Sequence, residues 1–268
     1  MPTVLLTRPR QRSHADDTLH KVLRARNVGI VELPMITFSY PKDLSALDAA
    51  LTQLASGAFD FAVLSSPTAV EFFDERIKEL GIEKQIKEIA KLGAVGNATA
   101  ELLTLLGYSV SMPVPTNAGS RELSAMLANF GLNGKRILLL RSQIGLDHLN
   151  EALQSMGAST EVVTLYETAG PTLRDAAHLV MALEGEERPD VVAFFSPSSV
   201  SYFVKTLAEM SANLLRELPV LACVGETTAK AVEDLLRRRP EIVARKSDQA
   251  SLVEDVLIYL ESKTLGIQ

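Results

Sequence analysis

Short apolar runs alternate with longer amphipathic stretches along the whole chain. Short continuous runs of this kind are typical of parallel strands that are buried on both faces of a sheet. They occupy residues 4–6, 61–64, 92–95, 137–140, 191–195 and 220–224. The amphipathic stretches predict helices at residues 13–26, 44–55, 67–80, 98–106, 122–129, 147–156, 197–209, 227–238 and 252–262. This alternation predicts an α/β fold with parallel sheets.

The sequence also contains an internal repeat that covers most of its length. Residues 60–73 resemble residues 190–203, and each copy has a Ser-Pro pair directly after an apolar run. Farther along, Val-Gly-Asn-Ala-Thr-Ala at 95–100 resembles Val-Gly-Glu-Thr-Thr-Ala at 224–229. A repeat of this length predicts two similar α/β units rather than a solenoid of short repeats. Two such units facing each other would leave a cleft, and we expect the function there.

The order of elements within each copy predicts where the chain passes between the two units. Each copy begins with a strand that ends in arginine and leads to an extended stretch, at residues 33–38 and 162–168. Pairing of these two stretches would carry the chain across twice. We therefore expect one domain of residues 1–36 plus 168–268 and a second of residues 37–167. The alternative of two sequential domains that divide near residue 133 stays open.

Composition narrows the functional class. A chain of 268 residues with 47% hydrophobic residues can fill two cores. Its single cysteine, Cys223, lies in an apolar run and is interpreted as a small core residue of a protein in the reducing cytoplasm. The four histidines lack metal-ligand spacing, and the net charge of −6 argues against a general nucleic-acid binder. No apolar run is long enough to predict a membrane span or a leader peptide.

Two kinds of turn recur where predicted strands lead into predicted helices. Residues 66–68 (Ser-Pro-Thr) and 196–198 (Ser-Pro-Ser) place a hydroxyl at the N-cap and proline at the first helical position. Residues 96–99 (Gly-Asn-Ala-Thr) and 225–228 (Gly-Glu-Thr-Thr) turn on a glycine, which permits close approach of a ligand. Helix N-termini at the carboxyl edge of a parallel sheet bind anions. Each motif taken alone is equally consistent with a simple helix cap.

These motifs, in their order and spacing, resemble those of the uroporphyrinogen-III synthases over nearly the whole chain. The segments that carry the resemblance are Leu-Leu-Thr-Arg-Pro at 5–9, the two glycine turns, Gly-Lys-Arg-Ile-Leu-Leu-Leu-Arg at 134–141, Leu-Tyr-Glu-Thr at 165–168 and Phe-Phe-Ser-Pro-Ser at 194–198.

The resemblance implies two similar parallel-sheet α/β domains (duplicated flavodoxin-like units), joined by a two-stranded ladder with a cleft between them. It also implies an enzyme of tetrapyrrole and haem biosynthesis that closes the linear hydroxymethylbilane into uroporphyrinogen III. Water is lost and the terminal pyrrole ring is inverted. The resemblance further implies that the enzyme uses no metal or organic cofactor. We expect a monomer in the cytoplasm that binds neither nucleic acid nor membrane. A transient contact with the preceding enzyme of the pathway is left open.

The resemblance places the family's functional tyrosine at Tyr166, which we expect to donate a proton to the departing hydroxyl. An aromatic side chain that only packs is the alternative. The predicted substrate-binding residues are Arg8, Ser66, Gly96, Asn97, Thr99, Arg141, Ser196, Pro197, Ser198, Thr227, Thr228 and Lys230. They would compensate the eight carboxylates of the substrate. Arg10 and Arg12 are read either as ligands or as solvated charges.

Two further charged features affect this site. Glu226 puts a carboxylate at the second glycine turn, where a neutral residue would suit an anionic ligand better. The run Arg237-Arg238-Arg239 is expected to complement the C-terminal end of its helix, far from the cleft.

A different class of function stays open beside the enzyme. A non-catalytic two-lobed sensor that binds an anionic small molecule would have the same duplication and cleft. It would not explain Tyr166 or the ordered motifs. A phosphosugar or nucleotide enzyme is disfavoured, because the sequence has no Walker or Gly-x-Gly-x-x-Gly pattern.

Overall fold

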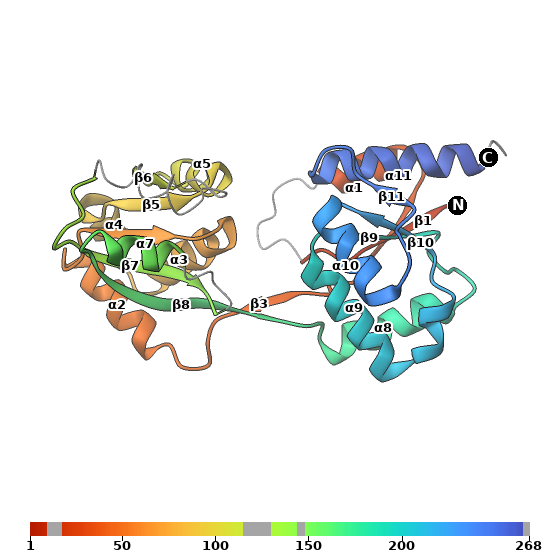
Figure 1. Ribbon diagram of the computed structural model, residues 1–268, viewed down its shortest axis with the longest axis horizontal. Coiled ribbons are helices and arrows are strands. Elements are labelled where there is room, and N and C mark those ends of the chain that lie inside the picture. Colours follow the sequence, from red (N-terminus) through yellow and green to blue (C-terminus); the bar gives the residue numbers. More distant parts are fainter. Residues whose placement is uncertain (10–17, 115–129, 144–147, 265–268) are drawn as a thin grey trace. The chain divides into compact units, whose positions relative to one another are not determined.

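A computed structural model describes residues 1–9, 18–114, 130–143 and 148–264 of the chain (Figure 1). The chain divides into two compact units. Unit 1 is Met1–Thr37 together with Ala169–Gln268, and unit 2 is Phe38–Thr168. Each crossing lies one residue later than the boundary expected from the sequence. The helix expected at 122–129 and the first part of the helix expected at 13–26 lie outside the described residues.

Unit 1 is built on a five-stranded sheet in the order β11-β10-β9-β1-β2, in which neighbouring strands run parallel. The strands are β1 (Thr3–Leu6), β2 (Gly29–Glu32), β9 (Val191–Phe194), β10 (Val220–Cys223) and β11 (Ile242–Val243). Alternate residues of β1 face opposite sides of the sheet. Val4 and Leu6 join one buried cluster, whereas Leu5 joins the other.

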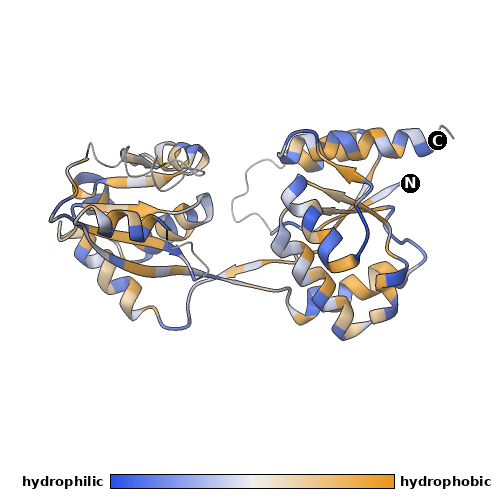
Figure 2. Ribbon diagram, viewed as in Figure 1, coloured by the Kyte–Doolittle hydropathy of each residue, from blue (hydrophilic) through white to orange (hydrophobic). Residues whose placement is uncertain are grey.

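Helices cover both faces of this sheet. The helices α1 (Thr18–Ala25) and α11 (Gln249–Thr264) contribute to the cluster that contains Val4 and Leu6. The helices α8 (Leu173–Glu184), α9 (Pro197–Met210) and α10 (Glu226–Leu236) contribute to the cluster on the opposite face, and a short 3₁₀ helix η2 (Ala212–Arg216) follows α9. Burial on both faces explains why β1, β9 and β10 are apolar runs, and such strands appear orange in Figure 2.

Unit 2 is built on a six-stranded sheet in the order β3-β8-β7-β4-β5-β6. The strands are β3 (Thr37–Ser39), β4 (Phe61–Leu64), β5 (Leu92–Val95), β6 (Val110–Val114), β7 (Arg136–Ser142) and β8 (Ser159–Ala169). The pairs from β8 to β6 are parallel. The neighbouring strands β3 and β8 contain both points at which the chain passes from one unit to the other.

Among the described residues of unit 2, more helices pack on one face of the sheet than on the other. Those on the face of Ala62 and Leu64 are α2 (Ser45–Ala55), α3 (Pro67–Glu79), α4 (Glu83–Ile89) and α5 (Asn97–Leu105). The helix α7 (His148–Ser155) packs on the opposite face, where Phe61 and Val63 point. The most strongly predicted part of the fold, the parallel α/β architecture, is thereby confirmed in both units.

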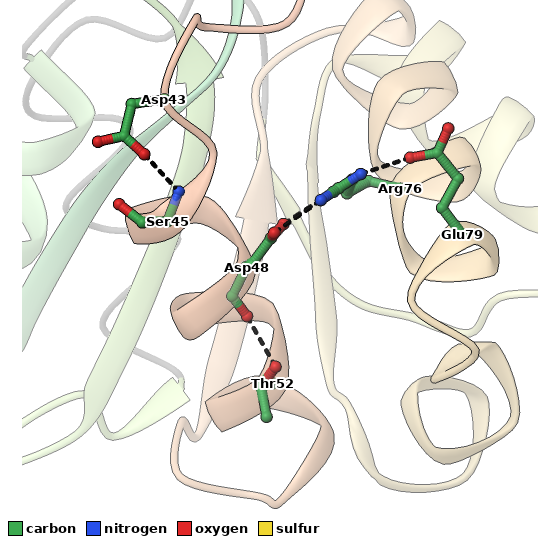
Figure 3. Close-up of polar contacts among 6 residues, drawn as sticks. All are labelled: Asp43, Ser45, Asp48, Thr52, Arg76 and Glu79. Carbon is green, nitrogen blue, oxygen red and sulfur yellow. Dashed lines mark hydrogen bonds and ion pairs between the residues drawn. The ribbon is translucent and has the colours of Figure 1, made fainter.

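An ion-pair network fixes α2 against α3 (Figure 3). The Arg76 guanidinium binds both oxygens of Asp48, with Nε 2.7 Å from Oδ1 and Nη2 2.6 Å from Oδ2. Its remaining nitrogen, Nη1, donates to Glu79 at 2.6 Å. The two carboxylates raise the pKa of Arg76 further above its already high ordinary value, chiefly through the hydrogen bonds from Asp48 and Glu79. The helices α2 and α3, which precede and follow β4 in the sequence, are therefore held together by a guanidinium that stays charged.

Candidate functional site

The repeated turns lie side by side in each unit because their strands are paired. In unit 2, Leu64 of β4 is the Cα partner of Ala94 of β5, and Ser66 and Gly96 each follow two residues later. In unit 1, Phe194 of β9 is the partner of Cys223 of β10, with Ser196 and Gly225 again two residues later. A Ser-Pro turn and a glycine turn thus occupy neighbouring positions at the carboxyl edge of both sheets. This edge is where open α/β sheets bind ligands.

The two Ser-Pro turns are helix caps. Ser66 Oγ accepts a hydrogen bond from the N–H of Ala69 at 3.1 Å, and Ser196 Oγ accepts one from Ser199 at 3.1 Å. Both helices have proline at the first position, where no N–H exists. The cap and the proline together remove two of the first-turn donors that could otherwise bind an anion. Both serines are half-buried, while Ser198 is exposed.

The two glycine turns keep more of their first-turn donors. Gly96 caps α5 with φ 81°, a left-handed conformation that favours glycine, and Gly225 caps α10. A glycine cap has no side-chain oxygen to accept from the helix N–H groups. The first residues of these helices include the exposed Asn97 in α5 and the exposed Thr227 in α10. The capacity for an anion therefore resides mainly in the glycine turns rather than equally in all four.

The fourth residue of each glycine turn points inward. The Thr99 side chain is 1% exposed, and its hydroxyl donates to the carbonyl of Val95 at 2.7 Å. Thr228, its repeat counterpart, is 3% exposed. The sequence predicts that Thr99 binds substrate through its hydroxyl, but this hydroxyl is engaged in holding the end of β5 against α5. The backbone N–H groups of the same turns are therefore better placed than this hydroxyl to donate to a ligand.

Tyr166 lies in unit 2 beside the first Ser-Pro turn. Its Oη is 3.2 Å from Ser66 Oγ, and either atom could be the donor. The ring is 7% exposed, stacks on Phe72 with centroids 5.3 Å apart, and meets the edge of Phe38 at 5.5 Å. A shift in register after Arg141 places Ser142 of β7 opposite Tyr166 of β8 rather than opposite Leu165. The side chain is therefore held at one place on the carboxyl edge by packing from three sides.

The predicted cationic ligands differ in what they already bind. Arg8 is 6% exposed, and its Nη2 lies 3.1 Å from Glu32 Oε1, which His20 Nε2 also approaches to 2.9 Å. Arg141 is half-buried on β7, and Lys230 is exposed on α10. The buried Arg8 thus already has a carboxylate partner in the exposed Glu32, whereas Lys230 is open to an approaching anion. Arg10 and Arg12 lie outside the described residues.

The arginine run 237–239 is arranged differently from the prediction. Arg237 is the C-cap of α10 in a left-handed conformation, and Arg238 donates to Pro219 O and to Glu241. Arg239 instead reaches back along α10 and binds Glu226 at 3.2 Å and Glu233 at 3.1 Å. The expectation that all three complement the C-terminal end of the helix was wrong for Arg239, because two carboxylates on one face of the helix bind its guanidinium.

Three residues near this edge were missed by sequence reasoning. Phe72 forms the platform on which Tyr166 stacks, and Glu32 binds Arg8. Ser247, in the loop after β11, lies so close to Gly225 that a Cβ there would be 2.7 Å from its Oγ. The apolar spacing of α3 signals that Phe72 is buried, but only the fold shows what it contacts. Glu32 and Ser247 have no comparable signal in the sequence.

Cys223 fits the predicted core position. The thiol is buried, and burial together with Glu226 and Glu241 raises its pKa to about 12. A thiol of this kind is almost entirely protonated near neutral pH and is a poor nucleophile. Among the described residues, no three His, Cys, Asp or Glu side chains are grouped so as to hold a metal ion. None of the helices in the described part of the chain is long and apolar enough to cross a membrane.

Comparisons with known proteins agree with one another. The family model of uroporphyrinogen-III synthase HemD matches residues 17–254. The uroporphyrinogen-III synthase of Chlorobaculum parvum is 26% identical, and the match covers 88% of this chain and 90% of the relative. That of Synechococcus elongatus is 25% identical, and the match covers 81% of each chain.

Two solved structures share the fold. The uroporphyrinogen III synthase of Thermus thermophilus, in a mutant form, has a TM-score of 0.60 at 16% identity, and the match covers 99% of this chain and 100% of that one. The enzyme from Helicobacter pylori 26695 has a TM-score of 0.61 at 18% identity, with coverage of 97% and 100%. Because the family model matches far more than half of the sequence, the chain belongs to the uroporphyrinogen-III synthase family.

Proposed function

We propose that this protein catalyses the closure of hydroxymethylbilane to uroporphyrinogen III, with loss of water and inversion of the terminal pyrrole ring. The observation that carries the proposal is the family match over residues 17–254, which includes both copies of the Ser-Pro and glycine turns. Family membership favours this enzyme over the two-lobed sensor.

The chemistry explains why a site with few acid and base groups suffices. A pyrrole nitrogen of the substrate pushes its electron pair toward the hydroxymethyl carbon, and the C–O bond breaks to give an electrophilic azafulvene. The last ring attacks through its substituted carbon, and the resulting spiro intermediate fragments and closes again with the ring inverted. In water the bilane closes without inversion. The enzyme must therefore mainly hold one conformation, and such orientation supplies much of the rate.

We propose that the turns at the carboxyl edge of each unit bind the carboxylates of the substrate. In unit 2 these turns contain Ser66, Gly96, Asn97 and Thr99, with Arg141 nearby on β7. In unit 1 they contain Ser196, Pro197, Ser198, Thr227 and Thr228, with Arg8 and Lys230. The exposed first turns of α5 and α10 support this proposal, because uncapped helix N–H groups and the helix dipole favour an anion.

The roles of these residues differ by their exposure. Asn97, Thr227 and Lys230 are exposed and are assigned to direct contact with substrate. The buried Thr99 and Thr228, together with the helix caps Ser66 and Ser196, are assigned to holding the turns in shape. A protein of net charge −6 can still bind a polyanion in this way. Salt screens the exposed charges that lie more than a Debye length, about 8–10 Å, from the substrate, so the nearby donors dominate.

We assign Tyr166 as the donor of a proton to the departing hydroxyl. Its Oη sits at the edge shared by the turns of unit 2, and a phenol O–H can donate there. The phenol O–H bond breaks, the proton goes to the hydroxyl oxygen, and water leaves with the electron pair of the C–O bond. The phenolate then recovers a proton from the pyrrole nitrogen of the azafulvenium ion.

We further propose a monomer that works in the cytoplasm and needs no cofactor.

The decisive experiment supplies freshly made hydroxymethylbilane to the purified chain and separates the porphyrin isomers after oxidation. The expected product is isomer III, formed much faster than the isomer I that appears in a protein-free control. A sensor would bind the bilane but leave isomer I as the product at the uncatalysed rate. That result would reject the enzymatic function.

A further inference from the structure

We propose that Ser66 is a positioning residue that acts on the reaction through Tyr166, rather than a ligand of the substrate. This inference rests on the proposed function and adds a role for the first Ser-Pro turn. Ser66 Oγ bridges two groups, since it accepts from the Ala69 N–H at 3.1 Å and lies 3.2 Å from Tyr166 Oη. The contact therefore connects the N-terminus of α3 directly to the proposed proton donor.

The direction of the bridge follows from how a hydroxyl divides its bonds. A serine hydroxyl has one proton to donate and two lone pairs to accept with. Acceptance from a helix N–H polarises the hydroxyl and makes its own proton a better donor, because chains of hydrogen bonds strengthen one another. When Ser66 donates to Tyr166 Oη, the phenol proton is left to point at the leaving hydroxyl. The serine proton also stabilises the negative charge that develops on the phenol oxygen as that proton departs.

The second copy of the turn shows that this arrangement is specific to unit 2. At the third helical position, Ser199 donates its hydroxyl to Ser196 O at 2.7 Å and accepts from the Ser196 N–H at 3.3 Å, which completes a capping box. The equivalent position in unit 2 is Ala69, which has no hydroxyl. The stretch of the first repeat equivalent to that of Tyr166, residues 33–38, contains no tyrosine. The two copies therefore share the cap, but only Ser66 has a phenol beside it.

Packing keeps the phenol at this distance. Phe72, in the second turn of the helix that Ser66 caps, stacks under the Tyr166 ring at an interplanar angle of 25°. Phe38 meets the same ring at 86° from another side. The helix thus positions the tyrosine at two points, by the serine at its cap and by the phenylalanine farther along. Loss of the Ser66 hydroxyl should leave the ring in place while removing its polar partner.

A double-mutant cycle tests the proposal. Ser66→Ala should lower kcat by about 10- to 100-fold, the effect of one hydrogen bond to a group that becomes charged, with little change in KM. In the Tyr166→Phe background the same change should cost less than about twofold. Ser66→Thr, which keeps a hydroxyl, should restore most of the activity. Ser66→Gly gives a second variant without the hydroxyl, because glycine is nearly as good an N-cap as serine and the helix stays intact.

Loss of a cap alone is controlled with Thr172→Ala. Thr172 caps α8 by accepting from Asp175 N at 3.1 Å, and it has no part in the proposed site. This variant should show the stability loss of a missing cap while kcat stays unchanged. Equal losses for Ser66→Ala in both tyrosine backgrounds, or a higher KM at unchanged kcat, would overturn the proposal in favour of direct substrate binding. Because the cycle requires a wild-type chain that forms isomer III, failure of the proposed function would be seen separately, as the absence of that product.

Discussion

The Glu226 carboxylate, at the first residue of α10, is held 3.2 Å from the guanidinium of Arg239, a residue that follows the C-terminal end of the same helix. Arg239 also binds Glu233 at 3.1 Å. The acid that was expected to disturb the second glycine turn is therefore partly compensated by a cation at the same place. We therefore expect the carboxylate of Glu226 to disfavour an anion at this turn less than its sequence position suggests.

Removal of Arg239 should weaken substrate binding although the residue is not proposed to touch the substrate. Arg239→Ala exposes the charge of Glu226, so KM should rise about two- to fivefold, as expected for exposed charges. The effect should shrink as salt is added and should vanish in the Glu226→Gln background. Arg26→Ala is the matched control, because Arg26 forms an exposed pair with Glu261 and precedes the amino end of β2. A rise in KM that persists with Glu226→Gln would contradict the charge argument.

Backbone and side-chain roles at the first glycine turn can be separated. Asn97 is the first residue of α5, where proline fits a helix, and Gly96 has ψ 157°, a value compatible with a following proline. Asn97→Pro deletes one N–H at the proposed anion site together with the Asn97 side chain, whereas Asn97→Ala deletes the side chain alone. Product affinity should be about tenfold lower in Asn97→Pro than in Asn97→Ala, with the melting temperature nearly unchanged. The affinity is measured by titration with uroporphyrinogen III under anaerobic conditions.

Thr99→Val should show the opposite pattern. It removes the bond to Val95 O in a buried position and should lower the free energy of unfolding by about 1 kcal/mol. Product affinity should stay within about twofold of wild type. A large loss of affinity in Thr99→Val at unchanged stability would mean that the hydroxyl turns outward and binds the substrate itself.

The sequence predicted the strands that are buried on both faces of their sheet. The strands β4, β7, β9 and β10 are buried on both faces, so continuous apolar runs identified them. The edge strands β2, β6 and β11 were missed: β2 is half-exposed, β6 contains Pro113, and β11 has only two residues. The helix α8 was also missed, although Thr172 and Asp175 have the spacing of a capping motif before an apolar run.

The candidate site was predictable as a set of turns but not as a set of contacts. Ser-Pro and glycine turns after apolar runs identify the carboxyl edge, because parallel strands end there together. The contact of Ser66 with Tyr166 joins residues 100 positions apart and depends on the register shift after Arg141. The inward orientation of Thr99 depends on a bond to the preceding strand. The contact of Ser66 and the orientation of Thr99 both depend on how the strands pair in the folded protein, which residue type and spacing do not specify.

The Arg76 network should be a main support of unit 2. Arg76→Lys keeps the charge but cannot bind both Asp48 oxygens and Glu79 in one plane. The free energy of unfolding should fall by about 1–3 kcal/mol, measured by urea denaturation. Lys84→Ala provides the control, because Lys84 and Glu88 form an exposed pair 3.9 Å apart that should contribute almost nothing. Equal small effects in both variants would show that the network does not stabilise the helix pair.

Cys223 should react only when unit 1 opens. Burial raises the pKa of this thiol to about 12, so the reactive thiolate is scarce near pH 8. As long as the pH stays below the pKa, the fraction of thiolate increases about tenfold for each pH unit. Labelling by a thiol reagent at pH 8 should therefore be at least about a hundredfold faster in denaturing urea than in buffer. Cys223→Ala should keep full turnover. Fast labelling of the native protein together with inactive Cys223→Ala would identify the thiol as functional.

Tyr166→Phe should lower turnover and still yield isomer III. The phenylalanine ring keeps its packing on Phe72 and Phe38, so substrate binding should barely change, whereas the proton donor is lost. A donor that water partly replaces should cost about 10²–10⁴-fold in kcat at most. Ring inversion should persist, because the conformation of the bilane is imposed by many carboxylate contacts rather than by one hydroxyl. The measurement is the initial rate with hydroxymethylbilane together with the ratio of isomers after oxidation. Full activity would reduce Tyr166 to a packing residue. A change to isomer I at a rate still above the uncatalysed one would mean that this hydroxyl steers the ring, contrary to the separation of proton transfer from orientation.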